Sequence, residues 1–221
     1  MRGHPTPPRA LASGEQPIVY VIDDDESVLR ALTNLFQSVN LRVEVFGSAL
    51  ELLHSSLPDV ASCLVLDIRL PGLSGLDFQT ELAKANIHIP IIFMTGHGDI
   101  PMTVRAMKAG AIDFLTKPFR QQEMLDAVAT AIERDRKRRA DDKMISNAQA
   151  RVETLTPRER DVLALVAAGL MNKQIAAELG IAEITVKIHR GHIMKKMGTR
   201  SVADLVRITE MLGIQREALA H

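Results

Sequence analysis

Short apolar runs alternate with segments of helical spacing between residues 18 and 120, and this alternation limits the fold more than any other feature of the chain. The apolar runs are expected to be strands at 18–22, 62–67, 90–94 and 111–115, and a stretch of alternating apolar and polar residues predicts a further strand at 41–46. Strands buried on both faces read as continuous apolar runs, and parallel strands need long, usually helical connections. The pattern therefore predicts an α/β doubly wound five-stranded parallel sheet with helices on both faces.

Polar residues stand where these predicted strands end. The first strand is followed by Asp23, Asp24 and Asp25, the third ends at Asp67, and the fourth and fifth are followed by Thr95 and Lys117. The carboxyl ends of parallel strands share one edge of a sheet, which is where such folds place ligand chemistry. Adjacent carboxylates repel each other, and hard oxygen ligands without His or Cys favour Mg²⁺. Taken alone, the three aspartates would be an ordinary surface turn.

The same residues form a consistent set for phosphoryl transfer. A carboxylate can attack phosphorus as a nucleophile, and an ammonium and a metal ion can neutralise the oxygens of the transferred group. Thr95 supplies a hydroxyl donor, and Lys117 supplies the ammonium. The combination indicates a phosphoryl site, although each residue by itself is common on protein surfaces.

Residues 151–221 show helical patterns only. A capping box of Thr156 and Glu159 begins one helix. A short helix at 172–179, with Asn172 as its expected N-cap, is followed by a turn at Gly180 and a longer helix at 183–197. This is the helix-turn-helix pattern. Residues 172–200 hold six Lys or Arg against two Asp or Glu, which favours an acidic partner such as DNA.

The composition of the chain excludes several classes of protein. The chain has 221 residues, 46% of them hydrophobic, so a packed core is expected. Cys63 is the single cysteine, which excludes an internal disulfide. No apolar run approaches the roughly 20 residues of a membrane helix. Because the N-terminal residues lack the apolar segment of a signal peptide, we expect a cytoplasmic protein with no membrane contact.

The expected division of the chain has four parts. They are a flexible tail (1–16), the sheet domain (17–132), a long helical linker (133–150) and the small all-α helix-turn-helix domain (151–221). The linker contains the charged run ERDRKRRADDK, which we interpret as a solvated helix rather than a nucleic-acid site.

Several independent motifs resemble those of two-component response regulators of the FixJ/NarL class. VIDDDES, LVLDIRLPGLSGLDF, IIFMTGHGDI and AGAIDFLTKPF are similar to the receiver domain. The run LTPRERDVLALVAAGLMNKQIAAELGIAEITVKIHRGHIMKKMG is similar to the LuxR-type helix-turn-helix domain. The resemblance implies a flavodoxin/receiver-like fold. It also implies a phosphorylation-activated, DNA-binding transcription regulator.

The resemblance assigns roles to the residues at the strand ends. Asp67 matches the phospho-acceptor, which a sensor histidine kinase would convert to 4-aspartylphosphate. Asp24, Asp67 and the backbone carbonyl of Arg69 would bind Mg²⁺, with Asp23 acting through water; the pairing Asp24/Asp25 remains an alternative to Asp23/Asp24. Thr95 and Lys117 match the residues that contact the phosphoryl group, and Lys117–Pro118 is expected to be cis.

The resemblance further implies a switch and its partners. Thr95 and Phe114 match the switch pair, and phosphorylation would produce a homodimer that binds promoter DNA, with RNA polymerase as a further partner. The expected DNA contacts lie on or beside helix 183–197 and are Thr185, Lys187, Ile188, Arg190, Lys195, Lys196 and Lys173. Such a protein is not an enzyme beyond self-phosphorylation and self-dephosphorylation. The alternative is an aspartyl-phosphate phosphatase or phosphotransferase, which uses the same strand-end chemistry.

Overall fold

The computed structural model describes residues 16–70, 72–96 and 100–214. The chain divides into two compact units, Met1–Arg139 and Ala140–His221. Their boundary lies within one continuous helix, α5 (Gln121–Glu153), which has 33 residues. The predicted tail lies outside the described residues except for Gln16, as does most of the GHGD segment that follows the fourth strand.

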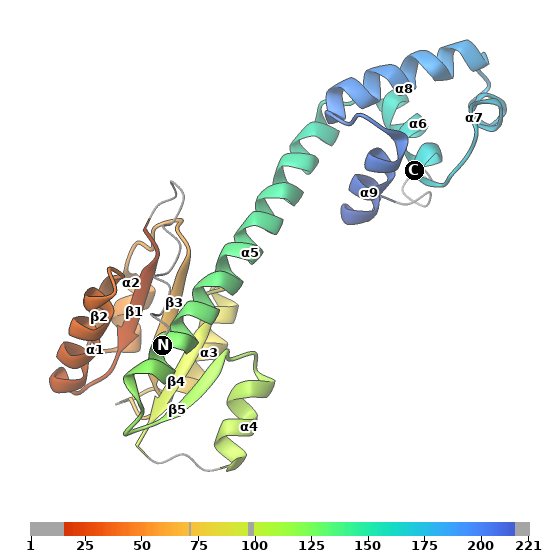
Figure 1. Ribbon diagram of the computed structural model, residues 1–221. Coiled ribbons are helices and arrows are strands. Elements are labelled where there is room, and N and C mark those ends of the chain that lie inside the picture. Colours follow the sequence, from red (N-terminus) through yellow and green to blue (C-terminus); the bar gives the residue numbers. More distant parts are fainter. Residues whose placement is uncertain (1–15, 71, 97–99, 215–221) are drawn as a thin grey trace, which may run out of the picture. The chain divides into compact units, whose positions relative to one another are not determined.

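The first unit is built on five parallel strands, as the sequence predicts (Figure 1). They are β1 (Ile18–Ile22), β2 (Arg42–Phe46), β3 (Ser62–Asp67), β4 (Ile91–Thr95) and β5 (Asp113–Thr116). Their order in the sheet is β2-β1-β3-β4-β5. β5 begins two residues later than expected, because the N–H of Ala111 donates to the carbonyl of Ala106 in the preceding helix.

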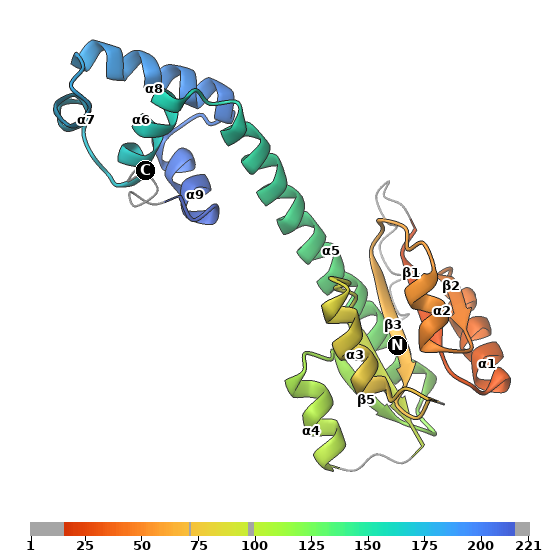
Figure 2. The same ribbon diagram turned by 180° about the vertical axis from the view of Figure 1, so that it is seen from behind.

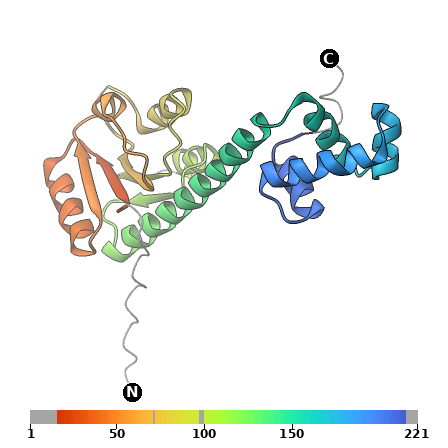
Figure 3. The same cartoon turned by 90° about the horizontal axis from the view of Figure 1, so that it is seen from above.

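Helices cover both faces of this sheet. They are α1 (Glu26–Ser38), α2 (Ala49–His54), α3 (Gly75–Lys84), α4 (Ile100–Lys108) and the first half of α5. α1 and α5 pack on one face, and α2, α3 and α4 pack on the other. In Figure 1 α5 lies in front of the strands, and in the reverse view of Figure 2 α3 does. Figure 3 shows the strands between the two layers.

The three central strands, β1, β3 and β4, are buried along their whole length, whereas the edge strands β2 and β5 are partly exposed. Every residue of β1 is 0% exposed, and so are Phe36 of α1 and Val128 of α5, which pack against one face of the sheet. Fully burying one such side chain stabilises the fold by about 1.5–3 kcal/mol. The sheet is therefore a rigid base for the side chains that follow its strands.

Strand register aligns the carboxyl ends of the strands. Ile22 of β1 pairs with Leu66 of β3, and Asp67 pairs with Met94 of β4. Asp23, Asp67 and Thr95 consequently lie at neighbouring positions on one edge. β1 lies between β2 and β3, so chain connections leave it in opposite directions and this edge is the topological switch point.

The second unit contains the end of α5 and four shorter helices. These are α6 (Pro157–Ala167), α7 (Asn172–Leu179), α8 (Glu183–Met197) and α9 (Val202–Met211). The predicted capping box is present, since Thr156 Oγ1 accepts from the N–H of Glu159 and Glu159 accepts from the N–H of Thr156. Val186, Ile193 and Met197 of α8 are 0% exposed and belong to the core of this unit.

The start of α7 differs from the sequence prediction. Met171, not Asn172, is the N-cap residue, and its N–H donates to Oε1 of Gln174 at 2.8 Å. The side chain of Asn172 instead accepts a hydrogen bond from Nη1 of Arg190 at 2.7 Å. Asn172 therefore joins α7 to α8 rather than capping its own helix, a long-range contact that local sequence cannot show.

Candidate functional site: an acidic edge joined by a lysine

Lys117 joins two carboxylates that come from different strands. Its Nζ lies 2.6 Å from Oδ2 of Asp23 and 2.7 Å from Oδ2 of Asp67. Asp23 is 1% exposed and Asp67 is 7% exposed. The ends of β1, β3 and β5 thus bring together three of the residues that the sequence predicts for one site.

The protonation of this cluster follows from burial and from its own charges. Burial raises the pKa of Asp23, and the hydrogen bond from Lys117 partly offsets that rise. Burial alone would lower the pKa of Lys117, but the hydrogen bonds that Lys117 donates to Asp23 and Asp67, together with the charges of these carboxylates, outweigh that effect and the pKa is raised. Lys117 therefore remains an ammonium at neutral pH, as a group that neutralises phosphoryl oxygens must be.

The residues beside the cluster come from the adjoining strands. Thr95 ends β4 and is 0% exposed, and its backbone carbonyl accepts from the N–H of Lys117 at 2.7 Å. The Lys117–Pro118 bond is cis, as expected. Phe114 lies on β5 opposite Phe93 and is partly buried against the core. The predicted hydroxyl and aromatic residues thus lie on the two strands that follow β3 in the sheet.

The three consecutive aspartates have different environments. Asp25 is the N-cap of α1, because its Oδ1 accepts from the N–H of Ser27 at 2.7 Å and from its hydroxyl at 2.6 Å. Asp23 is buried, and its Oδ1 accepts from the N–H of Asp25 at 2.9 Å. Asp24 is exposed. Asp25 already caps α1, which favours Asp23/Asp24 over Asp24/Asp25 as the acidic pair.

Asp67 is also held by the loop that follows it. The N–H of Arg69 donates to its Oδ1 at 2.8 Å. The sequence analysis missed Gly75, the first residue of α3, which packs against the backbone of this segment. A Cβ on Gly75 would lie 2.8 Å from the carbonyl oxygen of Asp67 and 3.0 Å from Cα of Ile68. Only glycine lets α3 begin so close to the end of β3; the signal was the Ser-Gly pair seven and eight residues after Asp67.

The oxygen atoms at this edge suit a hard cation. The described residues contain no cluster of three or more His, Cys, Asp or Glu side chains that could hold a metal by themselves. Mg²⁺ does not need one, since it keeps several waters and is usually bound through one or two carboxylates and a phosphate. The carboxylates of Asp23 and Asp67, which contact the same ammonium of Lys117, supply the protein carboxylates of such a site.

The exposed face of α8 is the second candidate site. Ile184 is 64% exposed and Ile188 is 51% exposed, and the side chain of Lys187 is 56% exposed. The face of α8 that carries the expected DNA contacts Lys187 and Ile188 therefore does face solvent. Large apolar side chains exposed on a helix between lysines are typical of a binding surface rather than of a core.

The predicted DNA-contacting residues divide into two groups by their present contacts. Lys173 and Lys195 are exposed, and their side chains form no hydrogen bond or ion pair with any residue that the structure describes. Lys187 pairs with Glu183 at 3.3 Å, one turn away on α8. Lys196 is engaged more firmly, since its Nζ lies 2.7 Å from Oε2 of Glu159 on α6.

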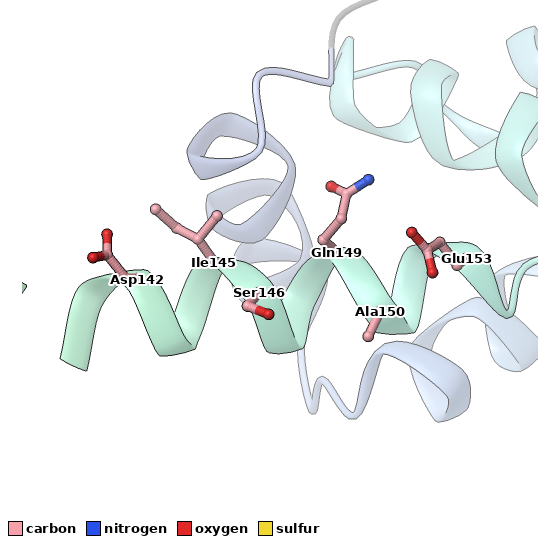
Figure 4. A pocket seen from close by; sticks show the side chains of 6 residues that line it. All are labelled: Asp142, Ile145, Ser146, Gln149, Ala150 and Glu153. Atoms are coloured by element: carbon pink, nitrogen blue, oxygen red, sulfur yellow. The ribbon is translucent and has the colours of Figure 1, made fainter. Parts of the chain in front are cut away.

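A shallow pocket of about 410 Å³ lies along α5, away from both candidate sites (Figure 4). It is lined by side chains of the last three turns of that helix, namely Asp142, Ile145, Ser146, Gln149, Ala150 and Glu153. None of the predicted site residues lines it.

Comparisons with known proteins place both units in established families. The family model of the response regulator receiver domain matches residues 19–129, and that of the bacterial regulatory proteins of the luxR family matches residues 153–209. The chain is 70% identical to Nodulation protein W of Bradyrhizobium diazoefficiens over 197 residues, which are 89% of this chain and 87% of that protein. It is 40% identical to Transcriptional regulatory protein FixJ of Azorhizobium caulinodans over 196 residues, 89% of this chain and 93% of FixJ.

A solved structure agrees with these relatives. The low-resolution structure of the response regulator StyR matches with a TM-score of 0.79 and 50% identity, over 88% of this chain and 98% of that one. Fold and sequence thus define a receiver domain joined to a helix-turn-helix domain. The chain belongs to the two-component response regulators with a LuxR-type DNA-binding domain, and it is a transcription regulator. Among its described helices, none has the length and apolar character needed to cross a bilayer.

Proposed function

We propose that Asp67 accepts a phosphoryl group from a sensor histidine kinase. An oxygen of Asp67 would form a bond to phosphorus while the P–N bond of the kinase phosphohistidine breaks, leaving an aspartyl phosphate and a neutral imidazole. The contact of Lys117 with Asp67 at 2.7 Å is the observation that carries this proposal, because it places a fixed positive charge beside the attacking carboxylate. The same geometry would permit self-phosphorylation from a small phosphodonor.

We propose Mg²⁺ as the cofactor of this step, bound by Asp23, Asp24, Asp67 and the carbonyl of Arg69. When bound, the ion would neutralise negative charge on the transferred group. Asp24 is exposed and can turn toward an ion, whereas Asp25 is committed to the cap of α1. Without the ion, Lys117 is the charge that balances Asp23 and Asp67.

The proposed switch follows from the charge that phosphorylation adds, roughly −1.5 to −2. Thr95 would donate its hydroxyl to the new oxygens, and Phe114 would move into the space that Thr95 leaves. The neighbouring helix α4 exposes apolar side chains, with Ile100 at 81%, Val104 at 43% and Met107 at 44%. These residues support a homodimer that forms through the face of α4, β5 and α5 after phosphorylation.

In the proposed output step, the C-terminal domain (151–221) binds promoter DNA, and the receiver (17–132) controls it through the linker (133–150). Thr185, Lys187, Ile188 and Arg190 would approach the bases, and phosphate contacts would come from Lys173 and Lys195, which are exposed without a recorded partner among the described residues. RNA polymerase would be a further partner, and the protein would act in the cytoplasm. The name of the 70% identical relative makes nodulation genes the first promoters to test.

The phosphatase or phosphotransferase alternative has less support. Such an enzyme needs a second general acid close to the nucleophile. The residue two positions after Asp67 is Arg69, whose cationic side chain is exposed.

Footprinting on genomic DNA with acetyl phosphate and Mg²⁺ tests the proposal. We expect protected sites that appear or strengthen with the phosphodonor and disappear in Asp67→Asn. Asp25→Asn is the matched control, since Asp25 is a neighbouring carboxylate with a capping role, and it should retain the response. Equal protection with and without phosphodonor would contradict the proposed control of DNA binding by Asp67.

A further inference from the structure

The last turn of α8 is held by residues of the segment that joins α5 to α6. Nη1 of Arg151, in the last turn of α5, donates to the carbonyl of Met197 at 2.7 Å. Nζ of Lys196 donates to the carbonyl of Thr154 at 3.2 Å and to Oε2 of Glu159 at 2.7 Å. We refer to Arg151, Thr154, Glu159 and Lys196 as the α8 latch.

The central carboxylate of the latch is buried and charged. The side chain of Glu159 is 5% exposed, and it also accepts from the N–H of Thr156 at 2.9 Å. The hydrogen bond from Lys196 lowers the pKa of Glu159 to about 2, against the opposing effect of burial. A buried charge with a single close ammonium is costly to separate from it, so Lys196 is held in place.

Arg151 closes the other side of the same turn. The carbonyl of Met197 is among the last four of α8, which have no partner within the helix, and a guanidinium there also suits the negative end of the helix dipole. Gly198 has a φ of +65°, which favours glycine, and a Cβ there would lie 2.6 Å from Nη1 of Arg151, so a side chain at this position would displace the guanidinium. Two cations from two helices thus fix one turn.

We infer that the α8 latch positions the recognition helix for DNA, and that Lys196 is a positioning residue rather than a phosphate contact. Lys195, next to it on α8, is exposed, and its side chain forms no hydrogen bond or ion pair with the described residues, so it is the phosphate contact of the pair. Nothing in the sequence distinguishes Lys195 from Lys196, but their side chains have different contacts in the structure. This inference rests on the proposed use of α8 to bind DNA.

The salt dependence of DNA affinity distinguishes a phosphate contact from a positioning residue. Each lysine that neutralises a phosphate contributes roughly 0.9 to the slope of log affinity against log salt concentration. The probe is a random-sequence 30-base-pair DNA duplex, and binding of the full-length protein is followed by fluorescence anisotropy. Measurements are made well below the unfolding temperature found by circular dichroism, so that every variant is folded.

We expect Lys195→Met to lower the slope by about 0.9 and Lys196→Met to leave it unchanged. Lys196→Met and Glu159→Gln should each weaken binding by roughly three- to tenfold, the range expected when one charge-assisted hydrogen bond that sets helix position is lost. Glu159→Gln retains the acceptor for Thr156, so the capping box persists. The double variant should lose less affinity than the two single losses combined, because both substitutions remove the Lys196–Glu159 contact; Lys196→Met also removes the contact with Thr154, and Glu159→Gln also removes the charge facing Nδ1 of His192.

Arg151→Gln gives an independent test from the other side of the turn. It should weaken DNA binding without changing the slope of log affinity against log salt concentration. Lys143→Gln is the control on the same helix and should change neither the affinity nor the slope. Lys196→Arg should restore much of the affinity lost in Lys196→Met, since it restores the charge opposite Glu159.

The outcomes separate failure of the inference from failure of the proposed function. A slope that falls equally in Lys195→Met and Lys196→Met would overturn the positioning role while supporting DNA contact by α8. Unchanged affinity in folded Glu159→Gln and Arg151→Gln would also overturn the latch. An unchanged slope in Lys195→Met together with a changed one in Lys196→Met would reverse the assignment, and no change in either would remove this end of α8 from the DNA interface.

Discussion

Asp135 is the most deeply buried charge on α5, and its removal should destabilise the receiver domain. Its side chain is 0% exposed, although α5 carries many exposed charges. Oδ2 accepts from the backbone N–H of Ser62 at 3.0 Å and from Nε of Arg139 at 2.7 Å. Oδ1 accepts from Nη2 of Arg138 at 2.7 Å, and Arg139 also pairs with Asp59.

The size of the effect follows from what Asp135→Ala leaves behind. The N–H of Ser62, at the first residue of β3 and 1% exposed, would lose its partner at a cost of about 1–3 kcal/mol. Breaking a fully buried ion pair typically costs about 3–5 kcal/mol. Arg138 and Arg139 are 35% and 25% exposed, so water can reach them and the lower end applies. We expect a loss of about 3 kcal/mol of unfolding free energy.

The chain provides its own probe for this measurement. Tyr20 is the sole tyrosine, the chain has no tryptophan, and Tyr20 is 0% exposed within β1. Its emission during urea unfolding therefore reports on the receiver domain of the full-length protein. With a dependence on urea of roughly 1.5 kcal/mol per molar, a loss of 3 kcal/mol lowers the midpoint by about 2 M.

The control is Asp126→Ala, which removes an exposed carboxylate from the same helix and should change the stability by no more than about 0.5 kcal/mol. If Asp135→Ala shifts the midpoint no further than this control does, the buried network does not stabilise the receiver. The argument from burial and unsatisfied donors would then be wrong.

Three further outcomes follow from the structure. Protonating Glu159 breaks its contact with Lys196; because its folded pKa of about 2 lies below the ordinary 4.5, that stabilisation is present above about pH 4.5 and is lost as pH falls toward 2. Circular dichroism should therefore show a steeper acid loss of helix stability in the wild type than in Glu159→Gln, and parallel curves would contradict the assignment. Gly75→Ala should lower receiver stability by roughly 1–3 kcal/mol, because its Cβ would lie 2.8 Å from the carbonyl of Asp67; a urea midpoint equal to that of the wild type would show that α3 can shift without cost. Asp25→Ala should cost about 1 kcal/mol through loss of the α1 cap, yet leave Mg²⁺-dependent phosphorylation intact; loss of phosphorylation in this variant would restore the alternative acidic pair.

The sequence predicts the receiver sheet well because each strand is a local pattern, and polar residues stand at the ends of four of the five. The position of Lys117 in the chain identifies a strand end, and parallel register then brings that end beside Asp23 and Asp67. This inference needs only the fold class. It does not depend on any side-chain detail.

The contacts that sequence cannot supply are those between residues distant in the chain. Asp135 lies three residues after the buried Ile132 of α5, and this helical spacing indicates that Asp135 is buried as well. Nothing in the local sequence shows that Ser62 is its partner. Lys195 and Lys196 look equivalent in the sequence, because their difference depends on Glu159, which lies on another helix. Asn172 was expected to cap α7 because asparagine is a preferred N-cap residue. The local sequence does not show the competing contact of its side chain with Arg190.

Covalent modification of Asp67 is the most direct test of the central claim that Asp23, Asp67 and Lys117 form a phosphoryl-accepting site. Intact-protein mass spectrometry after incubation with acetyl phosphate and Mg²⁺ measures it, with Asp25→Asn as the matched control. The account predicts one added phosphoryl group on the wild type and on the control, and none on Asp67→Asn. Full modification of Asp67→Asn, or none of the wild type, would contradict it.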